Sequence, residues 1–368
     1  MRSFMTYRGM AYAFIVMLTL TITSSPAAHD QDDTPQKWQR LLQSNRKQYG
    51  IAGQAIVVMH NGKVVFRGVD GEADISRHQP VLADSVFSAF SISKLFVSTL
   101  IMQLVEQGKL DLNRPASEYI HGLPARWKTI PLRDFLDHTS GVPEYFGDGK
   151  TEAVTSKTRF PSNLSAVFAS LADRPLTFTP GTEVRYTQTN YLVLSELLAS
   201  HYGKPYPQVV SERIIQPLHL EHTWLGKSNT PESHRVKAYT GINGTLREDD
   251  PIAWPAYAYG HAELYTTADD LARFMEAVAS GKLVGRTTLE RLWQPHELAN
   301  GQRGWFATGW EYGENHGYRE VGHDGGARSR VRILFRDSLA GDSWIIVYLT
   351  NGSATNVWSR TLVESIKK

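Results

Sequence analysis

The segments of this 368-residue chain that favour β-strands lie near its two ends. Near the N-terminus, residues 54–60 and 63–67 are rich in β-branched side chains and flank Asn61–Gly62, a pair that suits a two-residue hairpin turn. Near the C-terminus, residues 330–335 and 343–350 show a similar pattern around a polar turn. Because hairpins join antiparallel strands, we expect the two chain ends to form one largely antiparallel sheet.

The residues between these strands favour helices. Periodic apolar positions predict a mostly helical region over about residues 91–300, and an amphipathic helix over 35–49 precedes the first strand. The expected fold is therefore α/β, of the α+β type, with helices flanking an antiparallel sheet. We expect a single domain over residues 29–368, with its sheet built from about 54–70 and 318–350.

The first 28 residues have the pattern of a signal peptide. Two arginines precede an apolar run over residues 11–22, which as a helix would rise only ~18 Å and is too short for a ~30 Å hydrocarbon core. Small residues follow, and cleavage is expected near Ala27 or Ala28. The alternative is an uncleaved membrane anchor. Cleavage predicts a periplasmic or secreted protein without a stable membrane anchor.

The composition limits the partners that this chain can have. It contains no cysteine, which excludes disulfides, thiolate metal sites and a cysteine nucleophile. Its 39 basic and 37 acidic residues give a formal net charge of +2, and no long basic run is present. We therefore expect no nucleic-acid partner. The expected partner is a small-molecule or short-peptide substrate, and no cofactor or metal is expected. The oligomeric state does not follow from the sequence.

A serine and a lysine one helical turn apart form the first candidate site. Ser91 and Lys94 share one face of a predicted helix, so the lysine amine can reach the serine hydroxyl and activate it. The same spacing recurs at Ser44 and at Ser365, but both lie in polar segments that we expect at the surface. Ser91 instead begins an almost entirely apolar helix. The alternative is a lysine paired with a core carboxylate or extended toward solvent.

Two further stretches add polar residues at predicted turns. Tyr186 follows a Pro–Gly turn and precedes a predicted helix over 192–200, where a nearby lysine would lower the pKa of its phenol. Residues 321–328 carry three glycines that allow close approach of a backbone to a ligand. Taken alone, the first stretch is better explained by a core tyrosine at a helix start. The alternative for the second stretch is a loop that turns a corner.

Together the three stretches resemble the motifs of the penicillin-recognising serine hydrolases, namely Ser-x-x-Lys, Tyr-x-Asn and Lys/His-Thr-Gly. The resemblance is strongest to the group that contains class C β-lactamases, D,D-carboxypeptidases, D-aminopeptidases and esterases. It runs from about Gln54 to the C-terminus. Three supporting stretches match the family's patterns, at residues 107–112, 136–141 and 265–271.

This resemblance implies roles for particular residues. Ser91 would attack a carbonyl and become acylated, while Lys94 would control the protonation of the serine hydroxyl. Tyr186 would act as general base, and the roles of Lys94 and Tyr186 can be exchanged. The backbone N–H groups of Ser91 and Gly326 would form the oxyanion hole. The substrate would be bound by Gln188, His323, Asp324 and Gly325.

Two of these positions depart from the family pattern. Gln188 stands where the family has asparagine, and Asn190 is an alternative source of the amide. Asp324 stands where the family has a threonine that helps to bind a substrate carboxylate. An ionised aspartate would repel that carboxylate by ~4 kcal/mol at 4 Å and an effective dielectric of 20, unless Arg328 or Arg330 neutralises it.

A third departure is Ala262–Glu263, where the family has two glycines. This change adds negative charge to the expected cleft. The substrate of such a cleft need not be a β-lactam.

We therefore expect an exported serine hydrolase that cleaves an amide or ester through an acyl-enzyme on Ser91. One alternative is a class C-type β-lactamase or D,D-carboxypeptidase, and another is a ligand-binding member of the fold without catalysis. A metal hydrolase built on His219 and His222 is disfavoured, because the His-Glu-x-x-His arrangement is missing.

Overall fold

The computed structural model describes residues 35–146, 154–226 and 234–367. The predicted signal peptide, residues 1–28, lies outside the described residues. Across the three described ranges, no helix has both the length and the apolar character that crossing a membrane requires.

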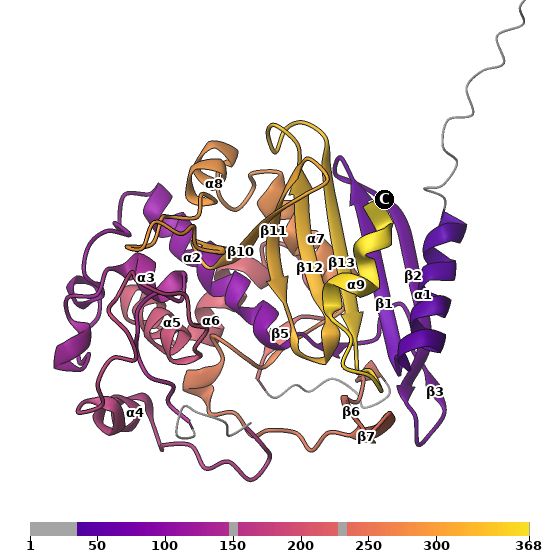
Figure 1. Ribbon diagram of the computed structural model, residues 1–368, viewed down its shortest axis with the longest axis horizontal. Coiled ribbons are helices and arrows are strands. Elements are labelled where there is room, and N and C mark those ends of the chain that lie inside the picture. The colour runs from indigo at the N-terminus through magenta and orange to yellow at the C-terminus, as the bar shows by residue number, and fades with distance from the viewer. Residues whose placement is uncertain (1–34, 147–153, 227–233, 368) are drawn as a thin grey trace, which may run out of the picture.

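One eight-stranded antiparallel sheet dominates the fold, in the order β3-β2-β1-β13-β12-β11-β10-β9 (Figure 1). The central pair, β1 and β13, joins the two ends of the chain, with Gln54 opposite Thr350. The predicted fold class is thereby confirmed. The strands are β1 (Gly53–His60), β2 (Lys63–Asp74), β3 (Gln79–Pro80), β9 (Phe306–Ala307), β10 (Trp310–Asn315), β11 (Tyr318–Asp324), β12 (Arg330–Phe335) and β13 (Ser343–Thr350).

The sheet has more strands than the sequence pattern predicts. Its C-terminal part begins at Phe306 rather than near residue 318. β9 has only two residues and β10 is polar, so neither shows the apolar alternation that marks a strand. The hairpin between β1 and β2 is as predicted. Asn61 and Gly62 have φ angles of 48° and 75°, the positive values that its tight turn requires.

Helices cover both faces of the sheet (Figure 1). α1 (Pro35–Tyr49) and α9 (Ser359–Val363) contribute to one apolar core, called the α1 core. α2 (Lys94–Glu106) and α7 (Ala268–Ala279) contribute to the other, called the α2 core. Successive residues of a strand point to opposite faces. The neighbouring β1 residue Ile56 accordingly packs in the α1 core, while Val57 packs in the α2 core.

The middle of the chain forms a mainly helical region that shares the α2 core with the sheet. Residues from the helical region and from the sheet are therefore held in fixed positions around α2. The helices are α3 (Leu132–Leu136), α4 (Leu164–Leu171), α5 (Thr189–Tyr202), α6 (Tyr206–Val210) and α8 (Arg286–Leu292). The short strands are β4 (Phe87–Ser88), β5 (Trp224–Leu225), β6 (Tyr239–Ile242), β7 (Thr245–Glu248) and β8 (Leu264–Thr266).

Candidate active site

Ser91 and Lys94 meet as the sequence spacing predicts. Ser91 lies in a short 3-10 turn, Phe90–Ser93, that leads directly into α2. The Lys94 Nζ is 3.3 Å from the Ser91 Oγ and donates a hydrogen bond to the His261 carbonyl at 3.1 Å. Lys94 is fully buried, and no described carboxylate forms an ion pair with it. The arrangement therefore rules out the lysine-carboxylate pair that was the structural alternative for this residue.

The environment of Lys94 favours its neutral form. Burial lowers the pKa of Lys94 well below its usual range, and the carboxylates of Glu144 and Glu311 only partly counteract this effect. A neutral amine has a lone pair that can accept a proton. Lys94 is thus equipped to act as a base toward the hydroxyl of Ser91.

Tyr186 lies over the same amine. Its ring centroid is 5.0 Å from the Lys94 Nζ, and its hydroxyl is shielded from solvent beside the side chains of Ser91 and Gln188. Burial raises the pKa of Tyr186, although the adjacent hydroxyl of Ser91 acts in the opposite direction. The sequence-based expectation of a lowered tyrosine pKa is therefore wrong. A neutral lysine supplies no positive charge, so it does not stabilise the phenolate form of a buried tyrosine beside it.

Glu144 anchors the segment that carries Tyr186. Its Oε2 accepts hydrogen bonds from the Thr187 hydroxyl at 3.1 Å and from the Gln188 N–H at 2.9 Å. Its Oε1 accepts from the Thr189 hydroxyl at 3.2 Å and from the N–H of Tyr145 at 3.0 Å. These bonds fix the entry into α5. Glu144 was not among the sequence-predicted residues, although it lies three residues after the recognised 136–141 stretch.

We expect Glu144→Gln to lower kcat and to alter the pH profile. An amide cannot accept all the hydrogen bonds of the carboxylate, so Tyr186 is displaced and kcat falls roughly 10- to 100-fold. Glu144 raises the pKa of Lys94, so its neutralisation moves the acidic limb of the kcat/KM profile to lower pH. The control is Glu183→Gln, an exposed glutamate in the same loop. An unchanged acidic limb would contradict this role.

The two candidate amides, Gln188 and Asn190, differ in what they contact. Asn190 is fully buried, and its amide is engaged by the Ser140 hydroxyl at 2.6 Å and by the His138 Nδ1 at 3.1 Å. The Gln188 Oε1 is shielded from solvent and has no hydrogen-bond partner among the described side chains and backbone. Gln188 is therefore the amide that remains available to a substrate, and Asn190 does not replace it.

His138 forms the floor beneath Tyr186. It is fully buried, and its ring centroid lies 4.4 Å from that of Tyr186. Burial, reinforced by the nearby Lys94, lowers the pKa of His138 well below its usual range. The ring is thus neutral and supports the tyrosine without adding charge. His138 belongs to the matching 136–141 stretch, but spacing alone does not predict its place beneath Tyr186.

His323 and Asp324 lie on opposite faces of β11. The His323 ring centroid is 6.0 Å from that of Tyr186, which places it on the catalytic face. Its Nδ1 is 2.6 Å from the Asp324 carbonyl, so Nδ1 carries the proton and Nε2 keeps a lone pair. Burial lowers the pKa of His323, with Glu311 acting against it and Lys94 in the same direction. His323 therefore offers a neutral acceptor.

The Asp324 carboxylate is neutralised on the other face. It accepts hydrogen bonds from Arg330 Nη1 at 2.7 Å and from Arg332 Nη2 at 2.6 Å, and also from the Ser359 hydroxyl of α9. Burial acts to raise the pKa of Asp324, but the two arginines outweigh it and the pKa is lowered. Arg328 instead contacts Asn356. Asp324 is thus ionised but compensated, which weakens the repulsion of a substrate carboxylate expected from the sequence.

Gly325 and Gly326 bring the end of β11 against the nucleophile segment. A Cβ on Gly325 would lie 2.7 Å from the Ala89 carbonyl oxygen, and one on Gly326 would lie 2.8 Å from the ring of Phe90. Phe90 itself has a φ angle of 48°, uncommon for a residue with a side chain. Gly326 thus lies against Phe90, the residue before Ser91, which suits the predicted oxyanion hole formed by the N–H groups of Ser91 and Gly326.

The rival metal site finds little support. His219 and His222 are exposed. Throughout the described ranges, no three histidine, aspartate or glutamate side chains gather closely enough to hold a metal ion.

A family model matches this chain, and curated relatives match it as well. The model, described as "Beta-lactamase", matches residues 38–362. The putative penicillin-binding protein PbpX of Bacillus subtilis (strain 168) is 28% identical over 272 residues, which are 74% of this chain and 66% of the relative. The "Beta-lactamase" of Escherichia coli (strain K12) is 26% identical over 273 residues, 72% of this chain and 68% of the relative. The chain thus spans about two thirds of the length of these relatives.

Solved structures share the same fold. EstCE1, described as a hydrolase with promiscuous acyltransferase activity, superposes with a TM-score of 0.71 at 21% identity, covering 90% of this chain and 98% of its own. The D-amino acid amidase from Ochrobactrum anthropi SV3, complexed with L-phenylalanine amide, gives a TM-score of 0.72 at 20% identity, covering 90% and 96%. At these identities the likeness establishes the fold alone.

Proposed function

Since this chain belongs to the β-lactamase family of serine hydrolases, we propose that it cleaves an amide or ester through an acyl-enzyme on Ser91. One observation carries this proposal: the Nζ of a fully buried lysine, Lys94, lies 3.3 Å from the Ser91 Oγ without an ion-pair carboxylate among the described residues. That geometry supports a nucleophile and its base within hydrogen-bond reach.

Acylation begins when Ser91 Oγ attacks the acyl carbonyl carbon. The neutral Lys94 amine accepts the hydroxyl proton, and the N–H groups of Ser91 and Gly326 hold the oxyanion that forms. When the intermediate collapses, the bond to the leaving nitrogen or oxygen breaks. The protonated phenol of Tyr186 donates a proton to that leaving group and regains one from Lys94. The acyl group remains as an ester on Ser91.

Deacylation repeats this chemistry with water as the nucleophile. Lys94, with Tyr186 beside it, accepts a proton from water as the water oxygen attacks the ester carbonyl. The bond to Ser91 Oγ breaks, and the oxygen recovers its proton from the same pair. A carboxylic acid leaves, and the enzyme returns to its starting state.

The polar groups around the site favour a substrate without a carboxylate. A neutral His323 supplies no positive charge to an anion, and the guanidinium groups of Arg330 and Arg332 are taken up by Asp324 and its neighbours on the other face. Hydrolysis of β-lactams is the second candidate, because a relative matched over 72% of this chain is described as a β-lactamase.

A hydrolysis screen tests the proposal. The panel holds short 4-nitrophenyl esters, amino-acid amides, peptides that end in D-Ala-D-Ala, and nitrocefin. Turnover of esters or amides with slow turnover of nitrocefin supports the proposed class, and fast nitrocefin turnover favours the β-lactamase alternative. A fluorophosphonate that fails to label Ser91 would contradict a serine hydrolase and favour the ligand-binding alternative.

We also propose that the protein is exported and processed. The apolar run at residues 11–22 is too short to span a bilayer, and small residues suited to signal peptidase follow it. The intact mass of protein recovered from outside the cytoplasm should correspond to an N-terminus between Ala27 and His29. A mature chain that still begins at Met1 would contradict processing.

A further inference from the structure

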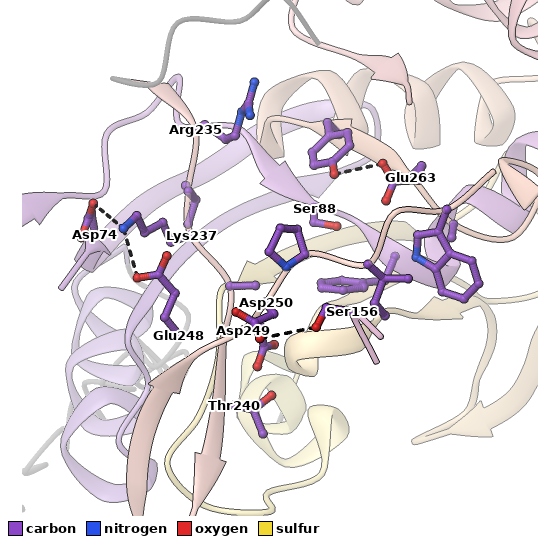
Figure 2. Close-up of a pocket in the computed structure, with 18 of the residues that line it drawn as sticks. Asp74, Ser88, Ser156, Arg235, Lys237, Thr240, Glu248, Asp249, Asp250 and Glu263 are labelled. Atoms are coloured by element: carbon purple, nitrogen blue, oxygen red, sulfur yellow. Dashed lines mark hydrogen bonds and ion pairs between the residues drawn. The ribbon is translucent and has the colours of Figure 1, made fainter. Parts of the chain in front are cut away.

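A cavity of about 760 Å³ is lined by Ser88 and Phe90, which precede the nucleophile in the chain (Figure 2). This volume falls in the range of small-molecule sites, about 300–1,000 Å³. Phe90, which directly precedes Ser91, lines the cavity, and so does Glu263. Glu263 lies two residues after His261, whose carbonyl accepts the hydrogen bond from Lys94. The cavity is therefore placed to hold a part of the molecule that Ser91 attacks.

Acidic side chains outnumber basic ones in the lining, five to three. Two of the basic groups are already engaged within the wall: Lys237 contacts Asp74 at 3.2 Å and Glu248 at 3.0 Å, and Arg77 contacts Asp74 at 3.7 Å. Figure 2 shows the Lys237 contacts at the side of the cavity away from Glu263. The third basic group, Arg235, acts on Tyr265, and no described cation shifts the pKa of Glu263. The Glu263 carboxylate therefore has no compensating charge among the described residues.

Glu263 occupies the position of the lining that adjoins this segment. The pairing of β4 with β8 sets Ser88 opposite Tyr265, and beyond it the Ala89 N–H donates to the Leu264 carbonyl at 2.8 Å. Glu263 is the residue before Leu264 in the chain. Glu263 has a φ angle of 63°, the left-handed conformation that favours glycine. Backbone strain of this kind persists mainly at functional sites. A glutamate held here despite the strain is expected to do something that glycine cannot.

The Glu263 carboxylate has unused hydrogen-bonding capacity. It is half-buried, and within the described part of the chain it accepts one hydrogen bond, from the Tyr265 hydroxyl at 3.1 Å. An ionised carboxylate offers about four acceptor positions. Burial raises the pKa of Glu263, so a cation bound beside it would restore the stability of the ionised form. A positively charged donor is the ligand that matches such a group.

We propose that this cavity binds a positively charged amino group of the substrate, with Glu263 as its ionic partner. The inference rests on the proposed function, because the amino group belongs to the molecule whose amide or ester Ser91 cleaves. It narrows the substrate class to amides or esters with a free amine near the scissile bond. The neutral acceptor on His323 Nε2 is compatible with such donor-rich substrates.

Paired substrates that differ only at the amine test this inference. Phenylalanine 4-nitroanilide is compared with its N-acetyl and N-succinyl derivatives, each as both enantiomers. We expect wild type to prefer the free amine by at least about tenfold in kcat/KM, and Glu263→Gln to lose most of that preference. Turnover of the N-acetyl substrate should change less than about threefold. The exposed Glu221→Gln, outside the cavity, is the control.

A binding measurement separates this inference from the proposed function. Calorimetry with Ser91→Ala compares phenylalanine amide with its N-acetyl form, and needs no turnover. Tighter binding of the amine that is lost in Ser91→Ala/Glu263→Gln supports the cavity as an amine site. Equal binding of both forms, or tighter binding of the N-succinyl form, overturns it. Failure of the proposed function would instead appear as wild-type protein that a fluorophosphonate does not label.

Discussion

Ser91→Ala is expected to lose at least about 10³-fold in kcat/KM on every ester or amide that the wild type cleaves. The methyl group cannot attack a carbonyl, so the acyl-enzyme cannot form, and what remains is the contribution of the oxyanion hole and of binding. The Lys94 amine loses the hydroxyl that lies 3.3 Å away. Initial rates with a 4-nitrophenyl ester measure the loss, and intact mass after fluorophosphonate treatment should show no adduct.

Ser93→Ala is the matched control for this experiment. Ser93 lies in the same 3-10 turn and is fully buried, but its hydroxyl has no hydrogen-bond partner among the described residues. Removing that hydroxyl therefore costs little stability, and kcat/KM should stay within about threefold of wild type. Activity that survives in Ser91→Ala at the level of Ser93→Ala would end the assignment of Ser91 as nucleophile.

Elements defined by local patterns were predicted closely. The amphipathic helix expected at residues 35–49 is α1, and the strands expected at 330–335 and 343–350 are β12 and β13 with those bounds. In each case a periodic apolar pattern is bounded by turn or charged residues, so local sequence holds the needed information. β9 and β10 were missed because their stability comes from pairing with the rest of the sheet rather than from their own composition.

The sequence predicts which residues form the candidate site. It does not predict how deeply they are buried or which groups surround them. Spacing alone brings Lys94 to Ser91, and the structure agrees. The direction of the Tyr186 pKa was predicted wrongly, because it depends on burial that a sequence does not display. The same holds for Glu144, whose four donors come from its neighbour Tyr145 and from the distant segment 187–189.

The alternation of β11 explains the outcome for Asp324. His323 and Asp324 are adjacent in sequence, and motif comparison treats them as one unit. On a strand, adjacent side chains point to opposite faces, and the Asp324 carboxylate meets Arg330 and Arg332 there. The sequence suggests Arg330 as a partner of Asp324, whereas Arg332 is found only in the structure. A register between β11 and β12 is needed to place both arginines beside one carboxylate.

Lys94→Met is expected to reduce kcat about 10²- to 10⁴-fold, the usual loss on removal of a general base. Methionine fills most of the space of the buried lysine stem and leaves the nucleophile in place. Tyr186→Phe should cost less in the acylation step, because burial keeps the Tyr186 hydroxyl protonated. Single-turnover rates of acylation measure both variants. If Tyr186→Phe abolishes acylation and Lys94→Met does not, the two residues exchange their roles.

Stability provides a second readout for Lys94→Met that does not depend on substrate. Burial lowers the native-state pKa of Lys94, so below the unfolded-state pKa of about 10.4 the unfolded chain binds more protons at this position than the native state does. Burial of Lys94 therefore lowers the free energy of unfolding most at low pH, and this destabilisation shrinks as the pH rises toward 10. We expect the Tm of Lys94→Met to exceed that of wild type at pH 6 and the difference to narrow by pH 9. A difference in Tm that does not change with pH would mean that Lys94 stays charged in the folded protein, and it could not then be the base.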